Sequence, residues 1–175
     1  ILSTTFLFSV IRVATPLLLA SMGAVITSNA GITNIGIEGV MLVSALVGVF
    51  ASAFGFGPWF GLFMAILTGV ACSLAIGYVS MSLKADSVLT CIAFNTMAVG
   101  GTVYFMYAVV KDKGTTIALD SGKLPNVELP LIKDIPILGE IISGQSILTY
   151  LAIIMVALMH VFIFKTRMGI RISAV

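Results

Sequence analysis

Five long apolar stretches constrain this chain more than any other feature of its sequence. A helix that crosses the hydrocarbon core of a bilayer needs roughly 20 consecutive, mostly apolar residues. Four stretches meet that length and a fifth is shorter but adequate; they cover residues 6–28, 35–54, 59–83, 87–110 and 147–164. Hydrophobic residues make up 59% of the chain and charged residues only 9%, far outside the soluble range. The sequence therefore predicts an all-α membrane protein, a bundle of about five spanning helices.

Turn-forming residues separate these stretches where membrane helices are expected to end. The segments NAGITN, GFGP and KAD are short, so the first four spans are predicted to be antiparallel neighbours. Residues 111–146 differ, because they hold three prolines and nine of the charged side chains, and they are too long for a simple connection. We expect one membrane domain over residues 1–175 with a soluble loop at residues 111–146.

Charge alone leaves the orientation of these spans open. Basic residues favour the cytoplasmic side of a membrane, and the tail carries Lys165, Arg167 and Arg171 without an acid. Lys111 and Lys113, however, lie on the side that a cytoplasmic tail assigns to the outside. The tail continues to Val175 as a basic polar segment, and we expect the chain to be the N-terminal part of a larger protein.

Small residues recur every four positions in two of the predicted spans. Such spacing lets helix backbones approach closely in lipid, where packing replaces the hydrophobic effect. The third span has Gly69, Ser73 and Gly77, and the second has Ser44, Gly48 and Ser52. We predict that both helices are buried on these faces. The candidate packing residues are Gly36, Gly39, Gly48, Gly69, Ser73 and Gly77.

Glu38 is the only acidic residue among the first 85, and apolar sequence surrounds it. One interpretation is structural, because a carboxylate in the first turn of a helix interacts favourably with the helix dipole. Asn34 stands at the expected N-cap position, one turn before Glu38. The other interpretation is that Glu38 lines a transport path. Glycines at 31, 36 and 39 indicate an interrupted backbone, which membranes tolerate only where protein or water covers it.

Three further polar residues fall within predicted spans. Arg12 is close enough to the end of its span to extend its guanidinium to the interface. Asn95 is too deep for that, so it must either bond another helix or face a cavity. His160 is expected to be an interfacial or backbone-bonded imidazole.

Several kinds of chemistry find no support in the sequence. Cys72 and Cys91 lie inside predicted spans without a C-x-x-C pattern, so we expect buried apolar residues and neither a metal site nor a disulfide. Phosphate-binding loops, zinc-protease motifs and nucleophile elbows are missing from the sequence. A net charge of +2 without a basic patch argues against a nucleic-acid partner. We therefore expect no cofactor, and any active transport would draw energy from a partner or an ion.

The stretch TPLLLASMGAVITSNAGITNIGIEGVMLVSALVG resembles the opening signature of permease subunits of bacterial ABC importers. The resemblance is to the group serving branched-chain amino acids, simple sugars and nucleosides, and is strongest to its sugar and nucleoside branch. The matching positions are Thr15, Pro16, Leu17, Leu18, Asn34, Ile35, Gly36, Glu38, Gly39, Met41 and Leu42. The stretch ADSVLTCIAFNTMAVG is similar to the family's second polar span, with Asp86 and Asn95 in matching places. Ser44 and Cys91 depart from the family's usual glycine, and Ser173 from its common arginine.

This resemblance implies an orientation and a mechanism. The tail, residues 165–175, resembles the start of the coupling region that meets a cytoplasmic ATPase, so residues 111–146 are expected outside and NAGITN inside. ATP binding to the separate ATPase would drive alternating access, and an extracytoplasmic binding protein or lipoprotein would deliver the solute. The expected partners also include a second permease subunit and membrane lipid of the bacterial cytoplasmic membrane. Candidate path residues are Asn34, Glu38, Thr90 and Asn95, and candidate coupling residues are Arg167, Arg171 and Ser173.

The alternative function is that of a secondary transporter, in which interrupted helices hold substrate and ions at mid-membrane. A protonatable Glu38 would suit such a carrier. A nucleoside and a simple sugar remain equally possible solutes, because the few polar groups along a path would suit either.

Overall fold

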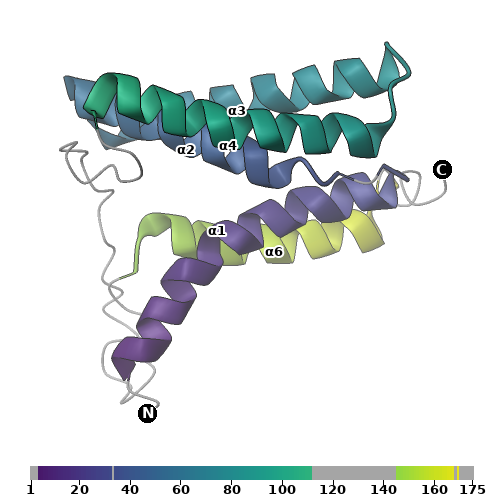
Figure 1. The fold of residues 1–175 in the computed structure, drawn as a ribbon. Coiled ribbons are helices and arrows are strands. Elements are labelled where there is room, and N and C mark those ends of the chain that lie inside the picture. The colour runs from purple at the N-terminus through teal and green to yellow at the C-terminus, as the bar shows by residue number, and fades with distance from the viewer. Residues whose placement is uncertain (1–3, 33, 112–144, 168, 170–175) are drawn as a thin grey trace. The chain divides into compact units, whose positions relative to one another are not determined.

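The computed structural model describes residues 4–32, 34–111, 145–167 and 169. The described chain is helical: α1 (Thr4–Asn29), α2 (Ile37–Ala51), α3 (Gly57–Met81), α4 (Ser87–Val110) and α6 (Ile147–Lys165), with the π-helical turn η1 (Ser52–Phe56) between α2 and α3 (Figure 1). All five α-helices contain a stretch long and apolar enough to cross a membrane. The prediction of an all-α protein with five spans is confirmed. The helices fall into two compact units, α1 with α6 and α2 through α4.

Helices α1 and α6 lie side by side, and buried polar side chains join them. The Thr15 hydroxyl is 2.8 Å from the carbonyl oxygen of Ile11 and 3.2 Å from the hydroxyl of Thr149 on α6. The side chain of Gln145, only 2% exposed, donates to the carbonyl oxygen of Phe8 at 3.0 Å. Hydrogen bonds of this kind hold helices together in lipid, where an unpaired polar group is costly.

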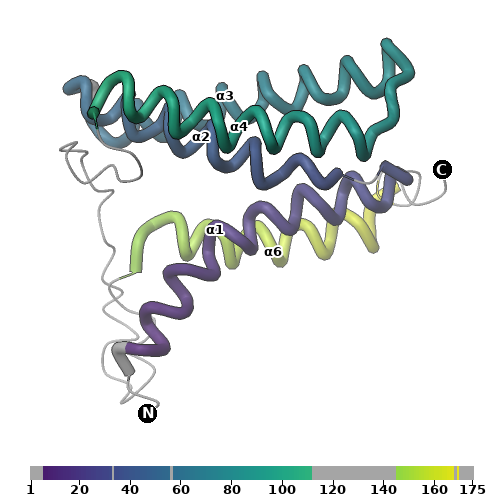
Figure 2. The backbone as a smooth tube through the Cα atoms, in the orientation of Figure 1, coloured from purple at the N-terminus to yellow at the C-terminus, as the bar shows by residue number. Residues whose placement is uncertain are grey.

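Helix α1 is bent in its N-terminal half, as the backbone tube shows (Figure 2). Pro16 lies inside the helix and has no N–H to donate to the carbonyl of Arg12. Thr15 hydrogen-bonds the carbonyl of Ile11 one turn back, which also favours bending. The Thr-Pro pair of the sequence thus accounts for the bend beside α6. Arg12 itself is exposed.

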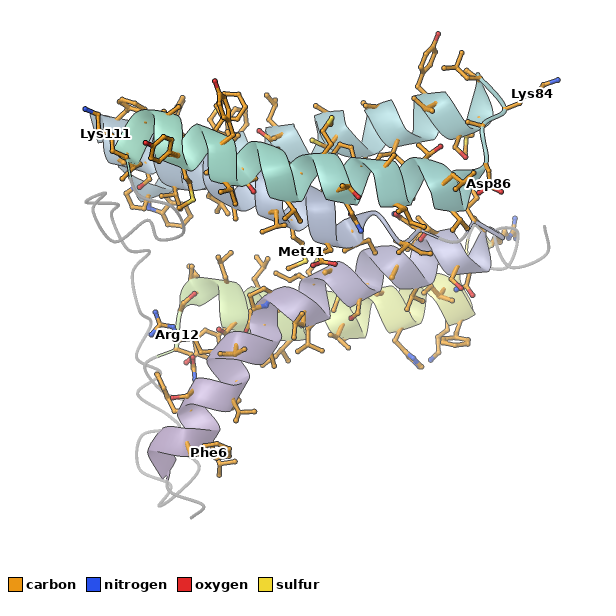
Figure 3. All side chains as sticks on the ribbon, in the orientation of Figure 1. Phe6, Arg12, Met41, Lys84, Asp86 and Lys111 are labelled. Carbon is orange, nitrogen blue, oxygen red and sulfur yellow. The ribbon has the colours of Figure 1, made fainter. Side chains whose placement is uncertain are left out.

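In the second unit, α2 contacts both α3 and α4. The turn from α2 to α3 is tight, because Gly55 and Gly57 have φ angles of 91° and 82° that other residues adopt only with strain. At the opposite end, the Asp86 carboxylate caps α4 by accepting from the N–H groups of Val88 and Leu89, at 2.8 and 3.0 Å. Lys84 and Asp86 mark this end of the unit and Lys111 the other (Figure 3).

Small residues bring α2 and α3 into backbone contact. A Cβ atom built on Gly61 would lie 2.6 Å from the carbonyl oxygen of Gly48, and one on Gly48 would lie 3.1 Å from the Cβ of Ala65. A Cβ on Gly69 would meet the Ser44 hydroxyl at 3.2 Å. The face of α2 predicted from Ser44, Gly48 and Ser52 therefore lies against α3.

The face of α3 that meets α2 is shifted by two turns from the predicted one. Its contact residues are Gly61, Ala65 and Gly69, whereas Ser73 is exposed beside a shallow groove and a Cβ on Gly77 would meet nothing within 4 Å. The prediction that Ser73 and Gly77 are buried in helix packing is not met within the described chain. The reason is that α2 meets α3 near the N-terminal end of α3, at Gly61, Ala65 and Gly69.

Gly61→Ala should destabilise the α2–α3 pair by about 1 to 3 kcal/mol, because the added methyl group would collide with the Gly48 carbonyl. Gly77→Ala is the matched control on the same helix, since its methyl group would enter open space. Thermal unfolding of the purified protein in detergent measures both. Equal midpoints for the two variants would contradict the observed contact.

Candidate functional site

The start of α2 gathers most of the predicted path residues. The residue at the N-cap position is Gly36, with φ −74° and ψ −1°, and it has no side chain to cap the helix. The prediction that Asn34 is the N-cap residue is therefore wrong by two positions. Asn34 still contributes, because its Oδ1 accepts from the Gly36 N–H at 3.1 Å. Its side chain closes a turn just before the helix instead of capping it directly.

Helix α4 supplies the missing cap. The Oδ1 atom of Asn95 accepts from the N–H of Gly39 at 2.8 Å, and the Nδ2 atom donates to the carbonyl oxygen of Ile35 at 3.0 Å. Gly39 is the third residue after the cap, whose N–H an N-cap side chain normally satisfies. One amide on α4 thus replaces the capping side chain that α2 lacks. Of the two predicted alternatives for Asn95, the structure shows bonding to another helix.

Cys91 lies one turn before Asn95 on the same face of α4. It is 1% exposed, and its Sγ is 3.7 Å from the Oδ1 of Asn34, within the range of a weak S–H hydrogen bond. Cys91 and Asn95 therefore both face the start of α2. The expectation of a buried Cys91 is confirmed, and the residue is also a neighbour of the capping network.

Two glycines make this close approach possible. A Cβ atom on Gly39 would lie 2.6 Å from the Asn95 Oδ1 and 3.0 Å from the ring of Phe94. A Cβ atom on Gly36 would lie 3.2 Å from the Ile76 side chain and 3.3 Å from the Cys91 sulfur. The predicted packing role of Gly36 and Gly39 thus corresponds to contact between α2 and its neighbours α3 and α4.

This junction lies at membrane depth. Helix α4 has 24 residues, so it is about 36 Å long, against about 30 Å for the hydrocarbon core. Asn95 stands eight residues into α4, which places it about 9 Å inside the core if α4 spans symmetrically. With that placement of α4, helix α2 starts inside the membrane, where each exposed backbone group is costly.

The carboxylate of Glu38 takes no part in the cap. The side chain is exposed, and within residues 4–32, 34–111, 145–167 and 169 it forms no hydrogen bond or ion pair. The N–H groups of Gly36 and Gly39 donate instead to Asn34 and Asn95. Glu38 retains its place in the first turn of α2, where the helix dipole favours a negative charge.

The N–H group of Glu38 has no acceptor among the described residues. It lies between the two donors that Asn34 and Asn95 satisfy. One backbone donor and one carboxylate are thus left at the start of α2 without a partner from the described chain.

The remaining candidates lie elsewhere. The hydroxyl of Thr90 donates within α4 to the carbonyl oxygen of Asp86 at 2.8 Å, so it is engaged away from α2. Arg167 is exposed just after α6, while Arg171, Ser173 and most of the loop at 111–146 lie outside the described residues. His160 is exposed and contacts the ring of Phe164. In the described parts of the chain, no three metal-ligating side chains come together.

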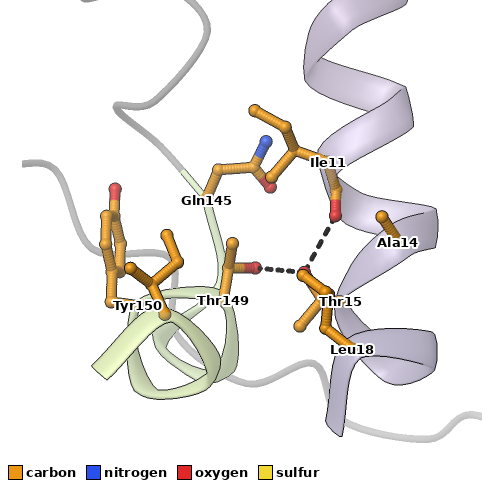
Figure 4. Close-up of a pocket in the computed structure, with 8 residues that line it drawn as sticks. Ile11, Ala14, Thr15, Leu18, Gln145, Thr149 and Tyr150 are labelled. Atoms are coloured by element: carbon orange, nitrogen blue, oxygen red, sulfur yellow. Dashed lines mark hydrogen bonds between the residues drawn. The ribbon is translucent and has the colours of Figure 1, made fainter. Parts of the chain in front are cut away.

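The first unit has a cavity of about 270 Å³ between α1 and α6 (Figure 4). Its lining includes Thr15, Gln145 and Thr149, which also hold the two helices together. The sequence does not predict this cluster, because single threonines and glutamines far apart in the chain give no spacing signal. Gly61 was not among the predicted packing residues, although Gly61, Ala65 and Gly69 share the four-residue spacing.

Removing the cap should cost more stability than removing the carboxylate. Glu38→Leu should change the free energy of unfolding by no more than about 0.5 kcal/mol, as for other exposed positions. Asn95→Leu should cost about 1 to 3 kcal/mol for each backbone group left unpaired. Thermal unfolding of the purified protein in detergent compares them. A loss from Glu38→Leu as large as that from Asn95→Leu would assign the cap to Glu38.

Comparison with known proteins supplies the family. Residues 6–175 match a family model described as the permease component of branched-chain amino acid transport systems. The chain is 33% identical over 174 residues to the guanosine ABC transporter permease protein NupQ of Bacillus subtilis, covering 93% of this chain and 52% of that protein. It is 30% identical over 169 residues to the nucleoside ABC transporter permease protein NupC of Lactococcus lactis, covering 93% and 52%.

A third relative, from Haloferax volcanii and named for glucose transport, is 29% identical over 94% of this chain and 49% of its own length. The chain thus spans about half the length of the curated relatives it matches. No solved structure matches it significantly. The match to the family model covers nearly the whole chain, so the chain belongs to the ABC permease family of branched-chain amino acid transport systems and their relatives.

Proposed function

We propose that this chain is part of the membrane-spanning permease subunit of an ATP-driven importer for a nucleoside or a simple sugar. The observation that carries the proposal is the family match over residues 6–175. Two of the relatives are named for guanosine or nucleoside transport and the third for glucose. The five apolar helices agree with a multi-pass protein of the cytoplasmic membrane.

The geometry at the start of α2 supports a role in transport. With α4 placed symmetrically in the membrane, the Glu38 carboxylate and N–H group lie inside the hydrocarbon core without partners from the described chain. Such groups are tolerated at that depth only where protein covers them or a water-filled path reaches them. We assign the path side of the junction to Glu38, with Asn34 beside it. Asn95 and Thr90 are weaker candidates for lining the path, because their side chains already form hydrogen bonds with backbone groups.

The proposed mechanism divides the work among subunits. This chain supplies the path, a separate cytoplasmic ATPase binds and hydrolyses ATP, and an extracytoplasmic binding protein delivers the solute. A second permease subunit completes the path. Arg167, Arg171 and Ser173 are proposed to meet the ATPase, since they follow α6 on the side assigned to the cytoplasm. The permease itself should bind solute weakly, because tight binding would slow release.

A carrier driven by an ion gradient finds no support in the relatives, whose names all describe ABC transporter permeases. The two mechanisms make opposite demands on Glu38. A proton carrier needs a side chain that titrates, whereas a path residue of an ATP-driven importer needs a polar group of the right shape.

We therefore expect solute uptake to continue when the proton gradient is collapsed, and also when an amide replaces the carboxylate at position 38. We expect Glu38→Gln to retain at least a third of wild-type uptake of radiolabelled nucleoside or sugar, and Glu38→Leu to lose at least nine-tenths. The measurement uses cells supplied with ATP in the presence of a protonophore. If wild-type uptake stops with the protonophore and Glu38→Gln is equally inactive, an ion-driven carrier replaces the importer.

The proposed coupling region can be tested by crosslinking. Ser173→Cys should crosslink to a cysteine on the ATPase surface in membranes, and ATP should change the yield because the coupling contact moves during the cycle. A cysteine in the loop at 111–146 is the control and should give no crosslink. Labelling of Cys at position 173 by an impermeant reagent added outside intact cells would reverse the proposed orientation.

A further inference from the structure

The amide of Asn95 holds the backbone on both sides of the start of α2. Its two bonds reach Ile35, just before the helix cap, and Gly39, in the first turn. Glu38 lies between these two anchor points. A change in the Asn95 side chain therefore changes the backbone that carries Glu38 without touching its carboxylate.

The start of α2 has no capping side chain of its own to fix its direction. Its cap residue is a glycine, and Gly39 lies in the first turn, where glycine gives the backbone extra freedom. Asn34 accepts from the N–H of the cap residue and weakly from the Cys91 sulfur. Among the described residues, Asn95 is therefore the side chain that ties this turn to a second helix through strong hydrogen bonds, beside the close packing of Gly36 and Gly39.

Asn95 and Gly39 also depend on each other sterically. A Cβ atom on Gly39 would lie 2.6 Å from Oδ1, closer than such atoms can approach. Replacing Gly39 by alanine would push the amide away and break the same bonds that Asn95→Leu removes. The chain thus offers two independent ways to release the anchor.

We propose that Asn95 is a positioning residue, which directs Glu38 toward the transport path by anchoring the start of α2 to α4. Each polar end of its side chain has a backbone partner in or next to α2, and we attribute its effect on transport to these two bonds. The consequence for transport rests on the proposed function, whereas the anchoring itself does not.

The first experiment reads the direction of position 38 without using transport. Glu38→Cys is introduced into the full-length permease with Cys72→Ser, keeping the buried Cys91, and the rate of reaction with an impermeant methanethiosulfonate reagent is measured in membranes. Background labelling is taken from the same protein with Glu38 intact. We expect Asn95→Leu and Gly39→Ala each to change the rate at least fivefold.

Thr96→Val is the matched control, because it removes a polar group at the same depth of α4 whose hydroxyl bonds only within that helix. We expect its labelling rate to stay within twofold of the parent. Equal rates in parent, Asn95→Leu and Gly39→Ala proteins would overturn the proposal. So would a position 38 that never reacts, because Glu38 would then not face water.

The second experiment tests whether Asn95 acts through Glu38. If it does, the double variant Asn95→Leu with Glu38→Leu should transport no worse than Glu38→Leu alone, because residues that act as a unit are not additive. If the double variant instead loses uptake by the product of the two single-variant factors, Asn95 contacts the solute or acts elsewhere, and the proposal is refuted. Immunoblots of membranes establish that each variant is present; where Asn95→Leu fails to accumulate, Gly39→Ala takes its place.

The outcomes separate this inference from the proposed function. If the wild-type importer takes up neither nucleoside nor sugar with ATP, the proposed function fails, and the labelling rates still decide whether Asn95 positions residue 38. If the wild-type protein takes up solute, Glu38→Leu retains full uptake and Asn95→Leu has none, the importer function is supported and the positioning role of Asn95 is wrong.

Discussion

The interaction on which the second unit depends is the pairing of one side-chain amide with the backbone at the start of α2. A helix that begins inside a membrane leaves its first N–H groups without water to satisfy them. A soluble helix would solve this with a serine or aspartate at its own cap, as Asp86 does for α4. Helix α2 instead has Gly36 there and takes its cap from Asn95 on a neighbouring helix.

The glycines of α2 follow from that arrangement. Gly39 leaves room for the Asn95 amide, and Gly48 lets the backbone of α2 touch α3 at Gly61. Helix α2 is thereby held between two neighbours, by hydrogen bonds toward α4 near its start and by close packing toward α3 along its second half. The hydroxyls of Ser44 and Ser52 are buried in the α3 interface without a hydrogen-bond partner among the described residues, and only their small size suits that place.

The polar residues of the membrane segments thus fall into two groups, those that hydrogen-bond other parts of the protein and those that do not. Asn34, Asn95, Thr15 and Thr149 are engaged with the protein, each in a hydrogen bond between or just before helices. Glu38 has no such bond to the described residues, although it stands in the middle of the capping network. A charged group in the hydrocarbon region is expensive, and the lack of a partner in the described chain supports the proposed role of Glu38 in the transport path. This contrast is the physical basis for assigning Glu38 to the path.

The sequence by itself determined the fold class, the number of spans and the family, because these depend on hydrophobic length and on a local motif that a single stretch of chain carries. It also located the important junction, since a lone carboxylate among glycines is visible without a structure. It could not assign the roles there. Asn34 was expected to cap α2 and Glu38 either to stabilise its first turn or to line a path, yet the main cap comes from Asn95, 56 residues beyond Gly39. Which stretch of α3 meets α2 was also beyond the sequence, because Gly61 and Gly77 both belong to the same four-residue spacing and only the position of the helix contact distinguishes them. Only the tertiary structure decides such matters, since hydrogen bonds and close packing between helices depend on how far one helix is shifted along another, and no periodicity within either helix records that shift.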